Sequence, residues 1–240
     1  MKNYYLLLGL LSLVMGCSKE PAIIVKEDID PIEDESIELI EQTQDDLETQ
    51  QFLEFVLLDQ QITLNLNNIP VLANYLEQHS DREKAIQEMQ LTQILSDDFD
   101  SIYLLSFACQ NDACSYLLLN TEIAESQLLA DQAQVVKIET SPGLEHLLIV
   151  FKRSLPNHPW DTFKLSIYDI ENWTEISLID DDTEIMGLHR FNWPIFDTVW
   201  LNETELEITL PNIETPDPVN LNEWHESDNE NFKKIIVEID

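Results

Sequence analysis

Three short segments of the sequence combine histidine with tryptophan and could therefore form a binding or catalytic site. They are N-H-P-W-D-T-F with His158 and Trp160, H-R-F-N-W-P with His189, Arg190 and Trp193, and E-W-H-E with Trp224 and His225. These rings offer flat faces with polar edges, which suit sugars and peptides. If the segments share one end of a sheet, they form a ligand platform. Alternatively, the tryptophans pack over the sheet and the histidines face solvent.

Signatures of nucleophilic and phosphate chemistry are missing from the sequence. It contains no G-x-S-x-G, no G-x-x-x-x-G-K-[ST] and no H-E-x-x-H, and its four glycines are too few for phosphate-binding loops. Two acidic runs, at residues 97–100 and 180–184, lack the alternating pattern of a calcium loop and are interpreted as solvated turns. No catalytic residue, metal or cofactor is predicted. A hydrolase that uses carboxylates beside the histidine segments is the enzymatic alternative.

Two cysteines, Cys109 and Cys114, flank Q-N-D-A between two apolar runs. A four-residue hairpin loop there would bring the two thiols within disulfide range. An exported protein meets an oxidising compartment, so a structural disulfide is predicted. A redox pair or half of a metal site is the alternative, although the spacing is not C-x-x-C and no second cysteine pair completes a zinc site.

The third cysteine, Cys17, follows Met1-Lys2 and a Leu-rich run that is too short to span a bilayer. Val14-Met15-Gly16-Cys17 resembles the lipobox of bacterial lipoproteins. That resemblance implies cleavage after residue 16 and a diacylglycerol on Cys17. Two or more acyl chains anchor a protein stably. We therefore expect a lipid-anchored protein of the cell envelope. Ser18 lacks the Asp that resembles an inner-membrane retention signal, which favours the outer membrane.

Four segments are expected along the chain. Residues 1–16 are the signal peptide, and residues 17–35, rich in acids and with Pro21 and Pro31, are an acidic tether. Residues 36–90 are predicted to be helical, with one helix over 36–60 and another over 70–90 that a Ser80/Glu83 capping box interrupts. Residues 91–240 form a β-rich region packed with the helices as one domain.

The β-rich region contains eight apolar, β-branched or aromatic runs separated by Asp, Asn, Pro and Ser. They cover residues 101–109, 114–120, 135–140, 145–153, 161–169, 173–179, 205–210 and 233–239. No helix-length crossover separates them, so antiparallel pairing is predicted. The fold class is therefore α+β, with N-terminal helices followed by a meander, sandwich or partial barrel. Residues 140–171 and 196–210 resemble β-propeller blades, but two partial units cannot close a propeller.

The formal net charge of −35 limits the choice of partners. Removal of residues 1–16 takes away Lys2 and no acid, which changes the charge from −35 to −36. Such a charge repels nucleic acid, and it favours cations, basic peptides or a basic protein. A role in solubility, or an organism whose exported proteins are all acidic, is the alternative explanation. The expected function is a membrane-anchored, non-enzymatic binding or scaffolding module, or else an acidic inhibitor or immunity-type binder of a basic exported protein.

Overall fold

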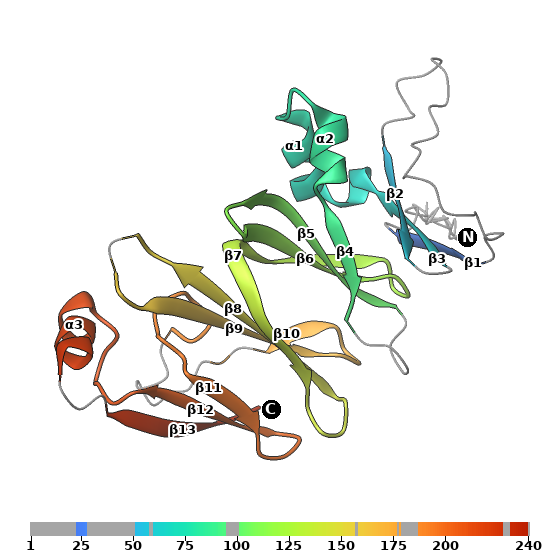
Figure 1. Cartoon of the computed structure of the whole chain (residues 1–240). Coiled ribbons are helices and arrows are strands. Elements are labelled where there is room, and N and C mark those ends of the chain that lie inside the picture. Colours follow the sequence, from blue (N-terminus) through green and yellow to red (C-terminus); the bar gives the residue numbers. More distant parts are fainter. Residues whose placement is uncertain are drawn as a thin grey trace, which may run out of the picture.

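Antiparallel strands stacked face to face in four layers make up most of the computed structural model (Figure 1). The structure describes residues 23–27, 51–57, 60–94, 101–156, 158–176, 178, 187–227 and 231–239. The strands are β1 (Ile23–Glu27), β2 (Phe52–Leu57), β3 (Gln60–Asn65), β4 (Gln90–Gln93), β5 (Ile102–Gln110), β6 (Ala113–Asn120), β7 (Glu125–Thr140), β8 (His146–Ser154), β9 (Asp161–Asp169), β10 (Thr174–Ile176), β11 (Asp197–Trp200), β12 (Glu205–Pro211) and β13 (Phe232–Glu238). The helices are α1 (Pro70–Glu77), α2 (Arg82–Gln87), α3 (Pro218–Glu226) and the 3₁₀ turn η1 (Leu66–Asn68).

Layer 1 is the sheet β1-β3-β2, and layer 4 is the sheet β11-β12-β13. Between them lies one seven-stranded sheet, β10-β9-β8-β7-β6-β5-β4, whose strand β7 bends. The first half of β7 pairs with β6 in layer 2, and the second half pairs with β8 in layer 3. Register shifts and a positive φ of 45° at Gln132 mark the bend. The two halves of this sheet therefore face each other.

Three hydrophobic cores fill the spaces between the layers. The first joins layer 1, α1 and α2 to residues such as Leu105 and Leu117 of layer 2. The second joins the opposite face of layer 2 to layer 3, and the third joins layer 3 to layer 4. Leu147 of β8 contributes to the second core and its neighbour Leu148 to the third. Each middle layer is therefore buried on both faces.

This double burial explains the hydrophobic patterns of the strands. Strands β5, β6 and β8 contain almost unbroken apolar runs because successive side chains enter two different cores. Strand β12, E-L-E-I-T-L-P, alternates because one face of layer 4 is open. All eight predicted strands are present, with antiparallel pairing.

The predicted fold class is wrong, because the N-terminal region is not a helical block. The described part of the helix predicted over 36–60 forms β2 and the first residue of β3, and these strands precede α1. Strand β2 alternates, with Leu53 buried and Glu54 and Val56 exposed. The irregular apolar spacing therefore reflects a period of two. Ile23–Glu27, within the expected tether, pairs with β3 as strand β1.

The helix predicted over 70–90 is correct in outline. It is divided into α1 and α2, but Asp81 caps α2 by accepting a 3.0 Å hydrogen bond from the Lys84 amide, in place of the predicted Ser80. Helix α3 was not predicted, although Asp217 before Pro218 is a typical start signal. Among the described residues, none of the helices has the length and apolar content to cross a bilayer.

Candidate functional site

Six rings form a continuous cluster around α3, which we name the aromatic surface. Its members are His158, Trp160, Phe196, Trp224, His225 and Phe232. Trp160 lies between two imidazoles, with its centroid 5.2 Å from that of His158 and 6.0 Å from that of His225. Two of the three predicted histidine–tryptophan segments therefore meet.

Trp224 holds the other half of the aromatic surface together. Its ring centroid lies 5.6 Å from that of Phe196 and 5.7 Å from that of Phe232. The two phenylalanines contact each other edge to face at 4.7 Å. The indole Nε1–H of Trp224 donates a 2.8 Å hydrogen bond to the backbone oxygen of Asn231. This bond fixes α3 against the start of β13.

Helix α3 is held in place by its cap and its buried face. The Asp217 side chain accepts hydrogen bonds from the amides of Val219 and Asn220. These bonds, led by the one from Asn220 and joined by the Thr215 hydroxyl, lower the pKa of Asp217. Leu221 and Trp224 are buried beneath the helix. The sequence around α3 therefore positions both Trp224 and His225.

Exposure divides the aromatic surface into packed and accessible rings. Trp160 is 8% exposed and Trp224 is 6% exposed, as expected for packing residues. Phe196 is 50% exposed and Phe232 is 46% exposed. The tryptophans therefore support the surface, and about half of each phenylalanine ring is open to solvent. Sequence reasoning missed both phenylalanines because neither lies beside a histidine.

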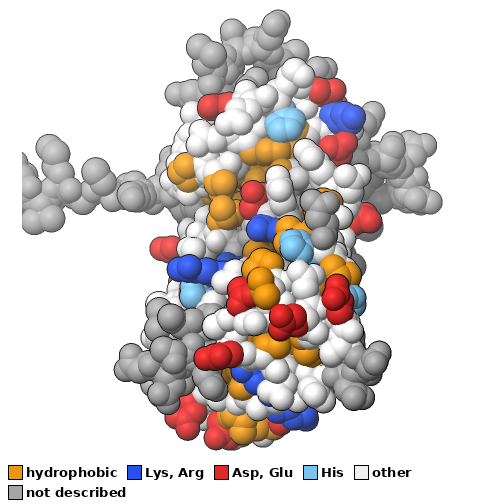
Figure 2. Space-filling model, turned by 90° about the vertical axis from the view of Figure 1, so that its left-hand side faces the viewer, with side chains coloured by type: hydrophobic (Ala, Val, Ile, Leu, Met, Phe, Trp, Pro, Cys, Tyr) orange, Lys and Arg blue, Asp and Glu red, His pale blue; other side chains and the backbone are white. Residues whose placement is uncertain are grey.

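Exposed acidic side chains lie on α3 and in the turn before it, close in sequence to Trp224 and His225. Glu223 and Glu226 are exposed on α3, and Glu214 is exposed in the turn before it. Among the residues that the structure describes, no ion pair joins these three carboxylates to a lysine or arginine. Figure 2 views the side of the molecule that carries α3 and shows acidic and hydrophobic side chains intermixed there.

The third predicted segment does not join the aromatic surface. Trp193 is 1% exposed in the core between layers 3 and 4, where its backbone pairs with Phe163. The Nε–H of Arg190 donates a 3.0 Å hydrogen bond to Nε2 of His189. Burial lowers the pKa of His189, and the charges of Arg190 and Lys164 lower it further. Within the described chain, no ring contact links this segment to the aromatic surface.

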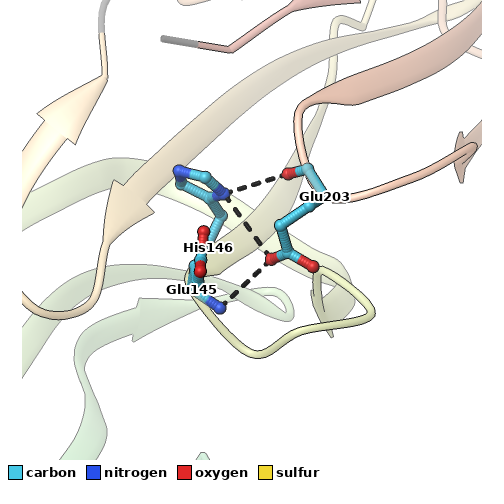
Figure 3. A group of neighbouring side chains, drawn as sticks. All are labelled: Glu145, His146 and Glu203. Carbon is cyan, nitrogen blue, oxygen red and sulfur yellow. Dashed lines mark hydrogen bonds and ion pairs between the residues drawn. The ribbon is translucent and has the colours of Figure 1, made fainter.

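A second polar cluster lies where the β7–β8 turn meets the β11–β12 turn (Figure 3). The carboxylate of Glu203 accepts hydrogen bonds from the Ser141 hydroxyl and from the amides of Gly143 and Glu145. These bonds, led by the one from Ser141, lower the pKa of Glu203. A Cβ at Gly143 would lie 2.5 Å from the Glu203 carboxylate, so the close approach requires glycine. We name this cluster the Glu203 latch.

His146 completes the Glu203 latch. Its Nδ1 lies 3.1 Å from the backbone oxygen of Glu203 and therefore carries the hydrogen that it donates there. The ring of His146 stacks on Trp200. Glu145, His146 and Glu203 are close enough to share a metal ion. However, Glu203 is already bonded to a hydroxyl and two amides, and Nδ1 of His146 is already a donor. The cluster is best explained as a structural hydrogen-bond network between layers 3 and 4.

Cys109 and Cys114 form the predicted disulfide, with an S–S distance of 2.05 Å. The hairpin is tighter than expected, because Gln110 pairs with Ala113 and leaves Asn111 and Asp112 as a two-residue loop. Both loop residues have positive φ, as a type I′ turn requires. The disulfide borders a groove of about 680 Å³. The two sulfurs are bonded to each other, so the pair serves as a structural crosslink of the hairpin.

An acidic pocket of about 510 Å³ lies between turns of layers 2 and 3, beside His146. Its carboxylates are Glu122, Glu145, Asp169 and Glu171. The pocket has the same sign of charge as the whole chain, so it disfavours anions.

The lipobox residues Val14 to Cys17 and the acidic runs at 97–100 and 180–184 lie outside the described residues.

Comparisons with known proteins do not identify the chain. No family model matches the sequence, and no curated protein matches it. Among solved structures, the tricorn protease matches with a TM-score of 0.33 and 11% sequence identity. The match covers 60% of this chain but only 12% of the length of that protein. It assigns neither a fold nor an activity, so the function is argued from the aromatic surface.

Proposed function

We propose that this protein is a membrane-anchored, non-enzymatic binding or scaffolding module of the bacterial cell envelope. The observation that supports binding is the aromatic surface, to which loop 158–160, the residue before β11, helix α3 and strand β13 all contribute. Its two half-exposed phenylalanines, Phe196 and Phe232, pack on the buried Trp224. A rigid, half-exposed aromatic area is typical of a binding surface.

The anchor in this proposal is a lipid on Cys17, placed in the outer membrane. Five residues separate Cys17 from the start of β1 at Ile23. Fully extended, they reach roughly 20 Å, which places layer 1 near the bilayer. The aromatic surface lies at the opposite end of the stack from β1 (Figure 1). It would therefore face away from the membrane, toward a partner.

Replacement of the anchor tests this proposal directly. Cys17→Ser should move the protein from the membrane fraction to the soluble fraction of the envelope. A Ser18→Ala variant, which keeps the cysteine, is the matched control and should stay in the membrane fraction. If Cys17→Ser stays in the membrane as firmly as the native protein, the anchoring half of the proposal is wrong.

The net charge of −35 favours a second candidate function, that of an inhibitor or immunity-type binder of a basic exported protein. Opposite charge accelerates association, and the acceleration falls as salt rises. Native protein immobilised on beads should then capture a basic envelope protein at low salt and release it at high salt. Capture of partners that show no excess of basic residues would contradict this candidate.

A further inference from the structure

We propose that the aromatic surface binds an arginine-rich segment of a partner protein. This inference rests on the proposed binding function and adds the chemistry of the ligand. It begins from exposed carboxylates on the helix that supports the exposed rings. Glu223 and Glu226 lie on α3, and Trp224 of the same helix contacts both Phe196 and Phe232. Apolar surface alone would suit many partners, whereas rings supported by an acidic helix select cations.

The local basic residues do not neutralise these acids. The Lys233 ammonium donates a 2.9 Å hydrogen bond to the backbone oxygen of Ile213 and lies over the Trp193 ring. The Lys234 ammonium pairs with Glu207 at 2.7 Å. Both lysines of β13 are therefore already engaged, and neither forms an ion pair with Glu223 or Glu226 in the described part of the chain. The negative charge on α3 remains available to a ligand that brings its own positive charge.

Arginine suits this combination better than lysine. Its planar guanidinium can stack on an aromatic ring and, at the same time, donate paired hydrogen bonds to a carboxylate. The fold contains the ring part of such a contact, since the guanidinium of Arg153 lies 3.9 Å from the centroid of Phe191 while it donates to the backbone oxygens of Asp131 and Gln132. A lysine ammonium is a compact, strongly hydrated charge that gains less from the ring face. A preference for arginine over lysine would therefore distinguish use of the rings from simple charge attraction.

The test uses the whole chain in detergent and deca-arginine as the probe, with deca-lysine and a neutral decapeptide for comparison. Binding is measured by calorimetry at low and physiological salt. We expect deca-arginine to bind several-fold more tightly than deca-lysine, and the neutral peptide not to bind. The double variant Phe196→Ala/Phe232→Ala should weaken deca-arginine binding about fivefold to tenfold. It should also remove most of the preference over deca-lysine.

Matched variants distinguish binding at a local site from attraction by the electrostatic field of the whole molecule. The test variant is Glu223→Gln/Glu226→Gln. The control variant is Glu77→Gln/Glu125→Gln, which changes the net charge equally at exposed residues on α1 and at the start of β7. Only the first pair should weaken deca-arginine binding, by about fivefold. Phe52→Ala, at a similarly exposed ring on β2, is the control for the phenylalanines and should leave binding unchanged.

Three outcomes would overturn the proposal: no binding of deca-arginine by the native chain, equal losses in the two glutamate pairs, or unchanged affinity in Phe196→Ala/Phe232→Ala. Circular dichroism checks that the variants are folded, and the half-exposed positions make unfolding unexpected. The anchor is tested separately by Cys17→Ser. If the protein is anchored but deca-arginine binds away from the aromatic surface, only this inference is contradicted. If deca-arginine binds at the aromatic surface but the protein is not anchored, only the anchor on Cys17 is contradicted.

Discussion

The third and fourth layers are joined at their two ends by different chemistry. At the end of β11, the Glu203 latch closes the interface with hydrogen bonds from Ser141, Gly143 and Glu145. At the start of β11, the aromatic surface closes it with packed rings. The latch surrounds the Glu203 carboxylate with donors, whereas the ring end leaves about half of each phenylalanine in solvent. The comparison shows that one interface can be closed at one end by directional hydrogen bonds and at the other by ring packing.

The two ends should also fail differently. Hydrogen bonds to a carboxylate depend on direction and on ionisation, so the latch should respond to pH and to loss of a single donor. Ring packing depends on buried area and shape, so the aromatic end should respond to loss of volume. Variants that remove one kind of interaction at a time can therefore separate the two ends.

The largest effect is expected for Trp224→Ala. The substitution removes a buried indole that contacts Phe196, His225 and Phe232, and it leaves a cavity under α3. Loss of a buried tryptophan of this kind costs about 3–5 kcal/mol of unfolding free energy. Denaturant unfolding measures it. Trp224→Phe is the control, because it keeps a ring but loses the hydrogen bond to Asn231, and it should be much milder. Equal effects of the two substitutions would contradict the packing argument.

A smaller effect, at the latch, is expected for Ser141→Ala. The hydroxyl of Ser141 donates to Glu203 and accepts a 3.0 Å hydrogen bond from the amide of His146. Ser141 is 1% exposed, so its removal leaves a buried amide without this acceptor. The expected loss is about 1–3 kcal/mol of unfolding free energy.

Hydrogen exchange locates the damage caused by Ser141→Ala. The β7–β8 turn and the 201–204 turn should lose protection, and α3 should keep it. The matched control is Ser154→Ala, at an exposed serine of the same strand pair whose hydroxyl bonds Asp161, and it should cost little. Loss of protection in α3 after Ser141→Ala would show that the two ends are not independent.

Much of the strand content could be predicted from the sequence, and the layering could not. Three of the predicted strands, β5, β6 and β8, are long apolar runs typical of strands buried on both faces, and β12 shows the alternation of a half-buried strand. The choice between helix and strand at 52–65 depended on period. Leu53 and Val56 are three residues apart, as on one face of a helix, but in β2 they lie on opposite faces. The pairing of β3 with β1 favours the strand, and this pairing joins residues that are far apart in the sequence.

The candidate site was predicted only in part, for the same reason. Trp160 and His225 lie far apart along the chain, and only the stacking of layers 3 and 4 brings them together. Phe196 and Phe232 carry no sequence signal beyond their own side chains. Glu203 lies in a polar turn, and its role appears only when the β7–β8 turn is placed against it. The local sequence pattern identifies individual strands and helices, whereas the aromatic surface and the Glu203 latch depend on contacts between strands and helices.

A mild effect is expected for Phe232→Ala, at the aromatic surface. About half of this ring is already in solvent, so its removal should cost about 1 kcal/mol of unfolding free energy. Thermal unfolding measures the change, with Phe52→Ala as the control at similar exposure. A cost as large as that of Trp224→Ala would mean that Phe232 supports the fold and does not serve mainly as accessible surface.

The smallest effect is expected from acid, and it should reach both ends. The pKa of Glu203 is lowered chiefly by the Ser141 hydroxyl, and that of Asp217 chiefly by the Asn220 amide. A carboxyl group with a lowered pKa stabilises the fold above its unfolded pKa and loses that contribution as the pH falls through its folded value. The latch should lose hydrogen-exchange protection below about pH 4.5, and the first turn of α3 below about pH 4.

Two variants assign this acid response to its groups. Asp217→Asn keeps an amide oxygen that can cap α3 but no longer titrates, so α3 should stay protected in acid while the latch still loosens. Glu203→Gln should loosen the latch at every pH and leave the acid response of α3 unchanged. Exchange rates must be corrected for the intrinsic effect of pH. If Asp217→Asn lost α3 protection at the same pH as the native chain, a group other than the cap would control the aromatic end.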